Sequence, residues 1–519
     1  MEKRVAIVGA GVSGLLACKY ASAKGFTPMV FEEQDEVGGL WNHTLESTTL
    51  QITKHLYEFS DFPWPSSVPE ETPPHNTQLV EYLQSYAHKF QLLQYVNFKC
   101  KVIDVDYVGE SENEMRSWDL WGGDGKAFGS KGKWILRVSH AGDDSIKEYE
   151  AEFLVLCIGR FSGLPNFPEF APGYGAEAFS GKVMHSMDFS NMDNAAAAQF
   201  IKGKRVAVIG AGKSAIDIAF ECANVNGRDK PCTMIQRGAH WMLPHHAHSW
   251  GLTDFLIFTR FVELMLHKPG EGFLSGAIAT LLTPVRWGLN RLVESFIKWQ
   301  MPLKKYDMIP KESFVREVSS CQIILLQPHF FDKVEDGSIV MRKSQNFTFC
   351  KEGLILDGEG VPLQVDIVIF ATGYKGDEKL KNMFASPTFQ NYIEGSPTST
   401  IPLYRQIIHP RIPQLAVIGY SESLSNIFSF EMRCKWLSHF LDGAFALPSM
   451  GAMEKEIEAW EKFMKRYAGN KEFRRSCIGG VPIWYNDQIC KDIGSSPRRK
   501  KGFFSELFEP YYATDYRGL

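Results

Sequence analysis

Two glycine-rich segments hold the residues of this chain that are best suited to bind a nucleotide. The first, VAIVGAGVSG at residues 5–14, places glycines with G-x-G-x-x-G spacing between an apolar run and a helix-like stretch. In this pattern the first glycine allows a tight turn, the second lets the backbone approach a pyrophosphate, and the third lets helix and strand pack closely. We therefore predict a dinucleotide site at Gly9, Gly11 and Gly14.

An acidic residue completes this first pattern. Glu32 closes the next apolar run, TPMVFEE at residues 27–33. A carboxylate at that strand end can accept a hydrogen bond from a ribose 2′-hydroxyl, while the N-terminus of the preceding helix faces the phosphates. Strand, glycine turn, helix, strand and carboxylate follow in the required order, which favours a true nucleotide site over a simple glycine turn.

The second segment, VAVIGAGKSA at residues 206–215, repeats the glycine pattern but not the acid. The following run, CTMIQR, ends in Gln236 and Arg237. A carboxylate repels the 2′-phosphate of NADP, whereas a guanidinium can pair with it bidentately, so the first site suits FAD and the second suits NADPH. The alternative is that Arg237 is a solvated surface residue. The residues predicted to bind NADPH are Gly210, Gly212, Lys213, Ser214, Ala215 and Arg237.

Two further apolar runs suggest how the sites are connected. The runs at 152–170 and 365–376 each break on a small residue and a glycine, and such strands link the nucleotide domains in proteins with paired dinucleotide folds. Thr372 and Gly373 in the second run are predicted to contact a cofactor. The expected fold is α/β, with two Rossmann-like domains and the NADPH domain inserted in a discontinuous FAD domain. Its predicted parts are residues 1–165 (FAD), 166–334 (NADPH) and 335–519 (FAD).

The composition limits the kinds of binding partner expected for this protein. The 519 residues carry a net charge of −4, so no basic field favours nucleic acid. The N-terminal apolar stretch resembles a secretory signal, but we interpret it as strand, turn and helix. No run reaches the length of a membrane span. The apolar segments 252–264 and 273–300 are expected to be core, in preference to a peripheral membrane surface.

The cysteines and histidines give no metal or redox pattern. The ten cysteines lack a C-x-x-C pair, so we expect a reduced, cytoplasmic compartment and no redox-active dithiol. His245, His246 and His248 lack a matching carboxylate or cysteine, and a loop or pocket-lining role is favoured over metal binding. We predict no metal site.

The string between the two glycine segments resembles a family signature. FSGKVMHSMDF, residues 179–189, matches F-x-G-x-x-x-H-x-x-x-[YF] of flavin-containing monooxygenases and their Baeyer-Villiger relatives. The resemblance extends over nearly the whole chain and implies that His185 organises the junction between the domains. Its other matching segments are FEEQDEVGGLW (31–41), EFSDFPWP (58–65), FATGY (370–374) and LAVIGYSESLSN (415–426).

The resemblance also implies roles for individual residues. Gly39, Leu40 and Trp41 match the turn near the flavin pyrophosphate, and Ser13 lies in the first glycine loop. The family's asparagine that supports the oxygenated flavin falls at Gln51, one methylene longer. This departure raises the question of how well oxygen activation is coupled to substrate oxidation.

What the resemblance implies is a FAD enzyme that uses NADPH and O₂ to oxygenate a nucleophilic nitrogen or sulfur through a C4a-hydroperoxyflavin. The substrate would be a small amine or thioether. YEFSDFPWP and PLYRQIIHPRIP (402–413) resemble the plant branch similar to the pipecolate N-hydroxylase. A Baeyer-Villiger monooxygenase, an uncoupled NADPH oxidase that releases H₂O₂, and a regulatory flavoprotein remain as alternatives.

Overall fold

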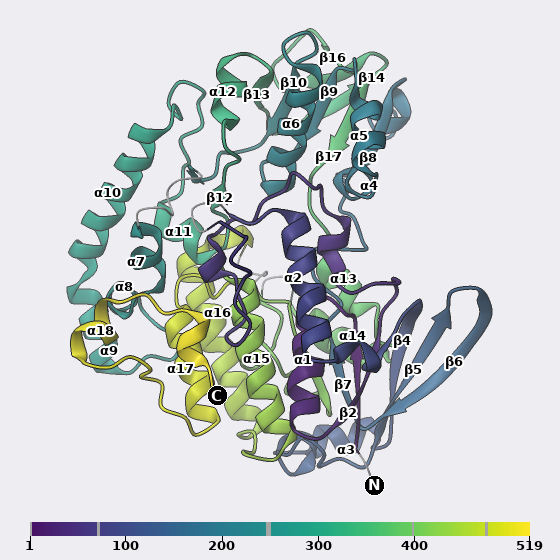
Figure 1. Ribbon diagram of the computed structural model, residues 1–519, viewed down its shortest axis with the longest axis vertical. Coiled ribbons are helices and arrows are strands. Elements are labelled where there is room, and N and C mark those ends of the chain that lie inside the picture. The colour runs from purple at the N-terminus through teal and green to yellow at the C-terminus, as the bar shows by residue number, and fades with distance from the viewer. Residues whose placement is uncertain (1–2, 70–72, 245–250, 397–398, 473–475) are drawn as a thin grey trace.

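The computed structural model describes residues 3–69, 73–244, 251–396, 399–472 and 476–519. The chain forms two α/β units, one above the other in Figure 1, and a five-stranded parallel sheet lies in each. The predicted pair of Rossmann-like units is confirmed.

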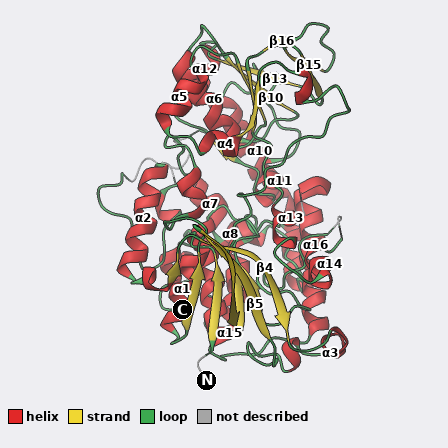
Figure 2. Cartoon of the chain, turned by 90° about the vertical axis from the view of Figure 1, so that its right-hand side faces the viewer, coloured by secondary structure: helices red, strands yellow, loops and turns green. Residues whose placement is uncertain are grey.

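The lower unit is built on a sheet of β1 (Arg4–Val8), β2 (Thr27–Phe31), β3 (Val96–Asn97), β7 (Phe153–Leu156) and β18 (Leu415–Val417). Its main helices are α1 (Val12–Ala23) and α15 (Asn426–Leu441). Its strand order is β18-β7-β1-β2-β3, and every pairing is parallel. Strands β1, β7 and β18 are short apolar runs that are almost entirely buried, as expected when helices cover both faces of a parallel sheet. Helix α1 packs against α15, so the N-terminal and C-terminal parts share one core. Helices lie on both sides of these strands in Figure 2.

The connection from β3 to β7 is an antiparallel sheet of β4 (Cys100–Val108), β5 (Lys133–His140) and β6 (Asp143–Ala151). This sheet extends from the lower unit at the right of Figure 1. The remaining elements of this half are η1 (Gly39–His43), η2 (Lys54–Leu56), α2 (Asn76–Lys89), η3 (Leu92–Tyr95), α3 (Glu112–Ser117) and η4 (Trp121–Gly123).

The upper unit contains η5 (Ala176–Ala178), β8 (Lys182–His185), α4 (Ser186–Ser190), α5 (Asn194–Ile201), β9 (Val206–Ile209), α6 (Lys213–Asn226), β10 (Cys232–Gln236), β13 (Ile339–Lys343) and β17 (Ile367–Phe370). Its sheet has the order β13-β10-β9-β17-β8, again with parallel pairings. A small antiparallel sheet of β14 (Phe347–Cys350), β15 (Gly353–Leu356) and β16 (Leu363–Gln364) packs beside it.

The sheet order corrects one predicted boundary. We placed the end of the NADPH domain at residue 334, but β13 and β17 both pair within the upper sheet. The upper unit therefore continues to Phe370. The physical reason is that β17 fills the gap between β9 and β8, so neither of these strands has its full set of backbone partners without it. The chain returns to the lower unit through α13 (Gly376–Lys381) and α14 (Pro387–Glu394) before β18.

A long helical excursion separates β10 from β13. It consists of β11 (Met242–Leu243), α7 (Leu252–Phe258), α8 (Arg260–Leu264), α9 (Phe273–Leu281), α10 (Thr283–Gln300), α11 (Phe314–Ser319), β12 (Ile324–Leu325) and α12 (Phe330–Glu335). Helix α8 contacts two helices of the C-terminal part, so the middle of the excursion packs on the lower unit (Figure 1). Strands β11 and β12 and helix α12 pack in the core of the upper unit. The C-terminal elements are α16 (Met450–Glu472), α17 (Pro482–Asp492), α18 (Phe503–Phe508) and η8 (Ala513–Tyr516).

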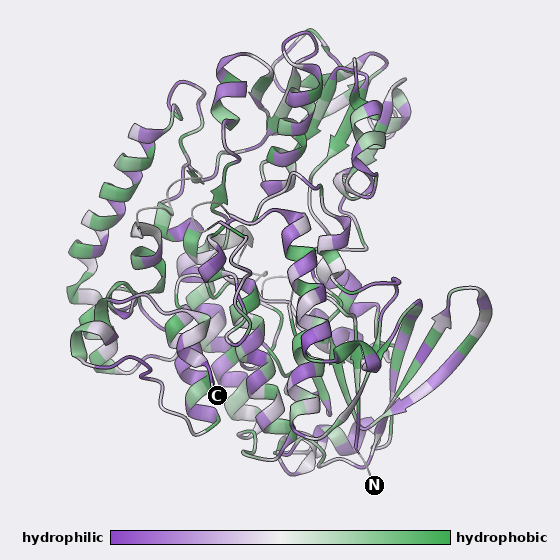
Figure 3. Ribbon diagram, in the orientation of Figure 1, coloured by the Kyte–Doolittle hydropathy of each residue, from purple (hydrophilic) through white to green (hydrophobic). Residues whose placement is uncertain are grey.

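The two apolar segments of this excursion differ in burial. Ile257 and Phe258 of the first are buried, as predicted. The second is core only in part: Ala279 and Ile297 are buried, but Phe273 is 95% exposed and Trp299 is 78% exposed, while Glu294 on the same helix as Trp299 is 3% exposed. Figure 3 shows apolar residues along α10 at the edge of the molecule. Helix α10 thus turns a carboxylate inward, where it accepts the Phe314 N–H, and apolar side chains outward. No helix among the described residues is long and apolar enough to span a bilayer.

The cysteines give a second correction. Cys321 and Cys477 form a disulfide, with their Cα atoms 5.8 Å apart and a sequence separation of 156. The sequence, which contains no C-x-x-C pair, predicts a reduced compartment, in which a disulfide is unexpected. Packing of the excursion against the C-terminal part brings the two residues together, and local spacing cannot reveal that.

Candidate functional site

The first glycine loop follows β1 and is tightly packed. Gly9 has φ +100°, and a Cβ there would lie 2.6 Å from the Cys157 carbonyl oxygen. A Cβ on Gly14 would lie 1.8 Å from the Gly9 oxygen. Both positions require glycine for the loop itself to form. A Cβ on Gly11 would come no closer than 3.6 Å to another group, the Gly39 Cα, which is an ordinary contact, so the protein leaves space at Gly11 for a ligand.

The N-terminus of α1 has the character of an anion site. Its N-cap is Gly11, with no side-chain cap and no acidic residue in the first turn. The backbone N–H groups of that turn are therefore available to a pyrophosphate, and the helix dipole favours its charge. A second turn lies alongside, because the Gly38 N–H donates to the Ala10 oxygen at 3.2 Å.

Four residues that the resemblance assigns to the flavin site lie in this loop or in η1, whose Gly39 contacts it. Gly39 begins η1, Leu40 is 38% exposed, and the Trp41 ring lies 6.3 Å from the Tyr57 ring. Ser13 is buried, and a Cβ on Gly419 would lie 3.1 Å from its Oγ. Segment 415–426, which resembles the C-terminal flavin segment of the family, thus reaches the first glycine loop.

Glu32 connects β2 to the same loop. Its side chain is 7% exposed, its Oε2 accepts the Ala10 N–H at 2.6 Å, and its Oε1 accepts the Gln34 N–H at 2.9 Å. Each carboxylate oxygen retains a second acceptor position, so a ribose hydroxyl can still donate to it. Glu32 therefore fits both a structural role in the loop and the predicted nucleotide contact.

The second glycine loop is more open. Gly210 has φ +148°, and a Cβ there would lie 2.4 Å from the Ala371 oxygen, so this position resembles Gly9. A Cβ on Gly212 would meet nothing within 4 Å. Helix α6 begins there without a side-chain cap, Ser214 is exposed, and Ala215 is fully buried. The loop can accept a phosphate at Gly212 and tolerates the Cβ of Ala215.

The two candidate residues at the end of β10, Gln236 and Arg237, differ in exposure. Gln236 is 3% exposed and points toward Met308, whereas Arg237 is exposed. Lys343 is the strand partner of Gln236 on β13, and its Nζ forms an ion pair with Asp307 at 3.0 Å. A guanidinium that stays in solvent at this strand end is free to pair with a 2′-phosphate.

A buried carboxylate joins the two units. Asp217 on α6 is 2% exposed; its Oδ2 accepts the Thr48 hydroxyl at 2.8 Å, and its Oδ1 accepts the Gln327 amide at 2.9 Å. The same Gln327 amide donates to the Ser47 oxygen at 3.0 Å. Lys213, predicted to contact the cofactor, instead directs its ammonium toward Asp217. These bonds connect the segment before Gln51 to the upper unit.

Gln51 lies at this junction. It is exposed in the lower unit, and its Oε1 accepts the Leu325 N–H of β12 at 3.3 Å. With the oxygen engaged, the Nε2 group is the side of the amide that can donate to a ligand.

The two predicted linkers lie side by side. The Asn166 N–H donates to the Gly373 oxygen at 2.9 Å, and the Asn166 amide donates to the Thr372 oxygen at 3.2 Å. Thr372 and Gly373 are therefore held at the crossing between the units.

His185 lies at the same crossing. It is fully buried, its ring is 5.4 Å from the Phe167 ring and 5.3 Å from the Tyr374 ring, and its Nδ1 accepts the Met187 N–H at 3.1 Å. Burial lowers the pKa of His185 and so favours the neutral imidazole. A neutral ring held between both linkers fits an organising role at the junction.

The sequence interpretation missed Thr48, Asp217 and Gln327. The available signal was a carboxylate four residues after Lys213 in the same helix, which predicts an i,i+4 pair and no more. The partners of Asp217 come from distant segments.

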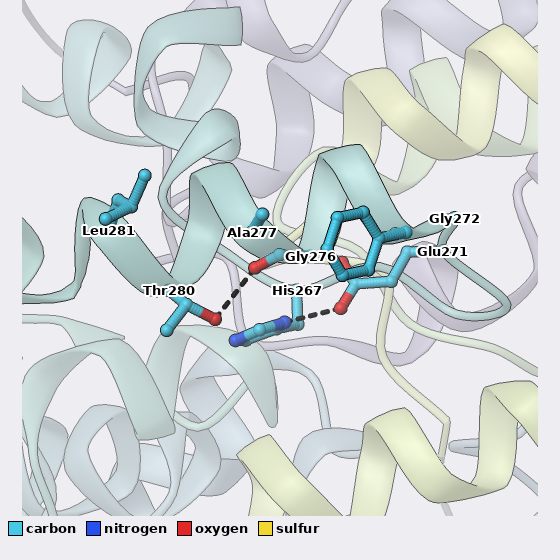
Figure 4. A pocket seen from close by; sticks show the side chains of 8 residues that line it. His267, Glu271, Gly272, Gly276, Ala277, Thr280 and Leu281 are labelled. Atoms are coloured by element: carbon cyan, nitrogen blue, oxygen red, sulfur yellow. Dashed lines mark hydrogen bonds and ion pairs between the residues drawn. The ribbon is translucent and has the colours of Figure 1, made fainter.

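Two other candidate sites involve none of these residues. A surface hollow of about 580 Å³ lies beside α9, between His267 and Leu281, and none of the predicted cofactor residues lines it (Figure 4). His245, His246 and His248 lie outside the described residues. Among the residues described, no group of three or more histidine, cysteine or carboxylate side chains could hold a metal.

Comparisons with known proteins agree with this arrangement. The chain matches the family model described as flavin-binding monooxygenase-like over residues 2–506. It is 40% identical to the probable flavin-containing monooxygenase 1 of Arabidopsis thaliana over 521 residues, which cover 99% of this chain and 96% of that protein.

Solved structures share the fold. The S-allyl-L-cysteine S-oxygenase from Allium sativum aligns with a TM-score of 0.58 and 18% identity over 95% of this chain and 89% of its own. OTEMO in complex with FAD and NADP aligns with a TM-score of 0.67 and 16% identity over 94% and 97%. The two uncapped helix N-termini fit the phosphates of the two nucleotides. The chain belongs to the flavin-binding monooxygenase-like family and is a FAD- and NADPH-dependent monooxygenase.

Proposed function

We propose that this monooxygenase oxygenates a nucleophilic nitrogen, or a sulfur, of a small metabolite. The observation that carries the proposal is the junction itself, where an exposed side-chain amide, Gln51, is hydrogen-bonded across the two nucleotide units. When bound, FAD accepts the hydride of NADPH and activates O₂. The protein then needs no nucleophile of its own; it must bind, align and shelter the reacting groups.

We assign the binding roles by loop. In the lower unit, Gly11 and the first turn of α1 would hold the FAD pyrophosphate, and Glu32 would accept a ribose hydroxyl. In the upper unit, Gly212 and the first turn of α6 would hold the NADPH pyrophosphate, and Arg237 would pair with its 2′-phosphate.

We assign the amide of Gln51 to the reacting face. Its oxygen is held by β12, so the Nε2 hydrogens can donate to a bound oxygen species or to the substrate. Asp217 and Thr48 act through this segment, as positioning residues, because they connect it to the helix that begins at the NADPH loop.

Incorporation of ¹⁸O from ¹⁸O₂ tests the proposal directly. The panel contains amines and thioethers, with pipecolate as the first cyclic amine because of the sequence resemblance. We expect one ¹⁸O atom in the product of at least one nitrogen or sulfur substrate, with an equivalent of NADPH oxidised. NADPH oxidation matched entirely by H₂O₂ over the whole panel would contradict it.

One observation favours a second function. Gln51 stands where the family resemblance leads us to expect asparagine, and its longer side chain is anchored to β12. If that position cannot support oxygen transfer, the protein is an NADPH oxidase that releases H₂O₂. The same ¹⁸O experiment, with H₂O₂ measured alongside, separates the two functions.

A further inference from the structure

The disulfide between Cys321 and Cys477 joins the helical excursion to the C-terminal part of the lower unit. Cys321 lies between α11 and β12, and Cys477 lies between α16 and α17. The two segments are in close backbone contact, since a Cβ on Gly479 would lie 2.7 Å from the Val318 oxygen. The disulfide therefore spans an interface that packing has already formed.

On one side the disulfide is attached to the predicted flavin segment. The Glu422 N–H donates to the Ser476 oxygen at 2.8 Å, and the Ile478 N–H donates to the Glu422 oxygen at 2.9 Å. Cys477 is therefore held between two backbone hydrogen bonds to segment 415–426, which reaches the first glycine loop. A change at Cys477 acts on a segment fixed to the FAD site.

On the other side the disulfide precedes the residues that hold Gln51. Leu325, which donates to Gln51, lies four residues after Cys321, and Gln327, which binds Ser47 and Asp217, follows two residues later. Locking Cys321 in place therefore restricts the segment that positions the Gln51 amide between the two units.

The pair also differs from the other cysteines. All eight others are free, and seven of these are buried. Cys321 is only half-buried, whereas Cys477 is 1% exposed. Cys321 is therefore the more accessible end of the disulfide, and after reduction the packing around Gly479 keeps the two thiols close enough to form it again.

We propose that Cys321 and Cys477 are a redox modification site that controls coupling in the proposed oxygenation. In the disulfide form the tether holds the β12 segment against Gln51, and activated oxygen reaches the substrate. Reduction by a dithiol transfers two electrons and two protons, which gives two cysteine thiols and leaves the dithiol as a disulfide. The loosened segment then allows more H₂O₂ to escape.

The escaped H₂O₂ can restore the tether. Two thiols and one H₂O₂ give one disulfide and two waters, through attack of the Cys321 thiolate on peroxide and of the Cys477 thiol on the resulting sulfenic acid. The H₂O₂ released when coupling fails thus re-forms the disulfide, and the disulfide improves coupling. This inference depends on the proposed function, because it requires both oxygen transfer and its uncoupled alternative.

Thiol counting tests the site without any turnover. Purified holoenzyme is denatured and labelled with a maleimide before and after dithiothreitol, and the labelled cysteines are identified by mass spectrometry. We expect eight labelled thiols before reduction and ten after it, with Cys321 and Cys477 as the two that appear. Ten thiols in both samples, from protein isolated without reductant and exposed to H₂O₂, would overturn the proposal.

Coupling is measured on the same holoenzyme as H₂O₂ released per NADPH oxidised. Reduction is expected to raise this ratio by at least about twofold, and added H₂O₂ followed by its removal to bring it back. Cys321→Ser should have the high ratio under both conditions. Cys350→Ser, which removes a partly exposed free cysteine of the upper unit, should respond to dithiothreitol as the natural protein does.

The outcomes separate this inference from the proposed function. A disulfide that forms and opens without any change in the H₂O₂ ratio would refute the control of coupling. Absence of ¹⁸O transfer to any substrate would refute the proposed oxygenation, while the thiol count would still report whether the site exists. Reduction of bound FAD by NADPH, followed by absorbance, confirms that each variant is folded.

Discussion

The two glycine loops of this protein share a pattern and differ in how much of it the protein itself requires. In the first, a Cβ on Gly14 would overlap the Gly9 oxygen, and the buried Glu32 receives a backbone N–H from the loop. In the second, Ala215 already carries a Cβ in the place of Gly14, and Arg237 remains exposed. The first loop is tightly packed at two of its three glycines, whereas the second leaves Gly212 and Arg237 open to solvent.

This difference suits the two nucleotides. A cofactor that stays bound can share its recognition residues with the folded loop, because binding and folding stabilise one another. A coenzyme that must enter and leave is better served by groups that keep their shape without it. We therefore expect substitutions in the first loop to affect flavin content and stability, and those in the second to affect kinetics.

The largest expected effect comes from the third position of each pattern. Gly14→Ala places a Cβ 1.8 Å from a backbone oxygen, so it should cost at least about 3 kcal/mol of stability and abolish FAD binding. Ala215→Gly, the matched change, should keep the yellow flavin and lower the melting temperature slightly. Thermal unfolding and the flavin absorbance measure both, and a stable yellow Gly14→Ala protein would show that the first loop is not packed as described.

Substitutions at the second glycine of each pattern compare the two loops at the cofactor sites themselves. In Gly11→Val the methyl groups occupy the pyrophosphate space, so we expect a colourless, poorly folded protein. Gly212→Val should be purified yellow but with a strongly raised KM for NADPH. The FAD-to-protein ratio and steady-state kinetics decide, and a normal FAD content in Gly11→Val would contradict the assignment of the first site.

Removing the positive charge of Arg237, at the end of β10, should have an intermediate effect. Hydrogen bonds to a charged group contribute about 1.5–3 kcal/mol, so Arg237→Ala should raise the KM for NADPH about ten- to a hundredfold. The KM for NADH should hardly change, since that coenzyme lacks the 2′-phosphate. Equal changes for the two coenzymes would mean that Arg237 does not read the phosphate.

The smallest expected effect comes from a substitution at Thr48, in the segment that connects the two units. Thr48→Val removes the hydroxyl that donates to Asp217 and leaves the glycine loops intact. We expect unchanged flavin reduction by NADPH and about two- to fivefold more H₂O₂ per NADPH, because one hydrogen bond contributes about 1 kcal/mol to holding the segment before Gln51. Thr48→Ser should restore the natural ratio. An increase that persists in Thr48→Ser would assign the effect to packing.

Much of the fold could be predicted from local sequence patterns. The order of apolar runs, glycines and charged strand ends in residues 5–32 and 206–237 predicted two parallel α/β units, because each requirement of the nucleotide loop falls within one short stretch. The same reasoning misplaced the end of the upper unit, since β13 and β17 are ordinary apolar strands whose membership depends on pairing with β10 and β9.

Amphipathic segments were predicted less well. A periodic apolar face identifies a helix, but not what covers that face. The two segments at 252–264 and 273–300 look alike in sequence, yet one packs into the core and the other exposes Phe273 and Trp299.

By itself, the sequence determined the two nucleotide loops, their opposite strand-end charges and the choice of FAD and NADPH, because those properties depend on neighbouring residues. Only the tertiary structure decided that Asp217 meets Thr48, that Gln51 meets Leu325 and that Cys321 meets Cys477. Each of these pairs joins segments more than 150 residues apart, where contact results from the packing of whole units and leaves no periodic trace along the chain.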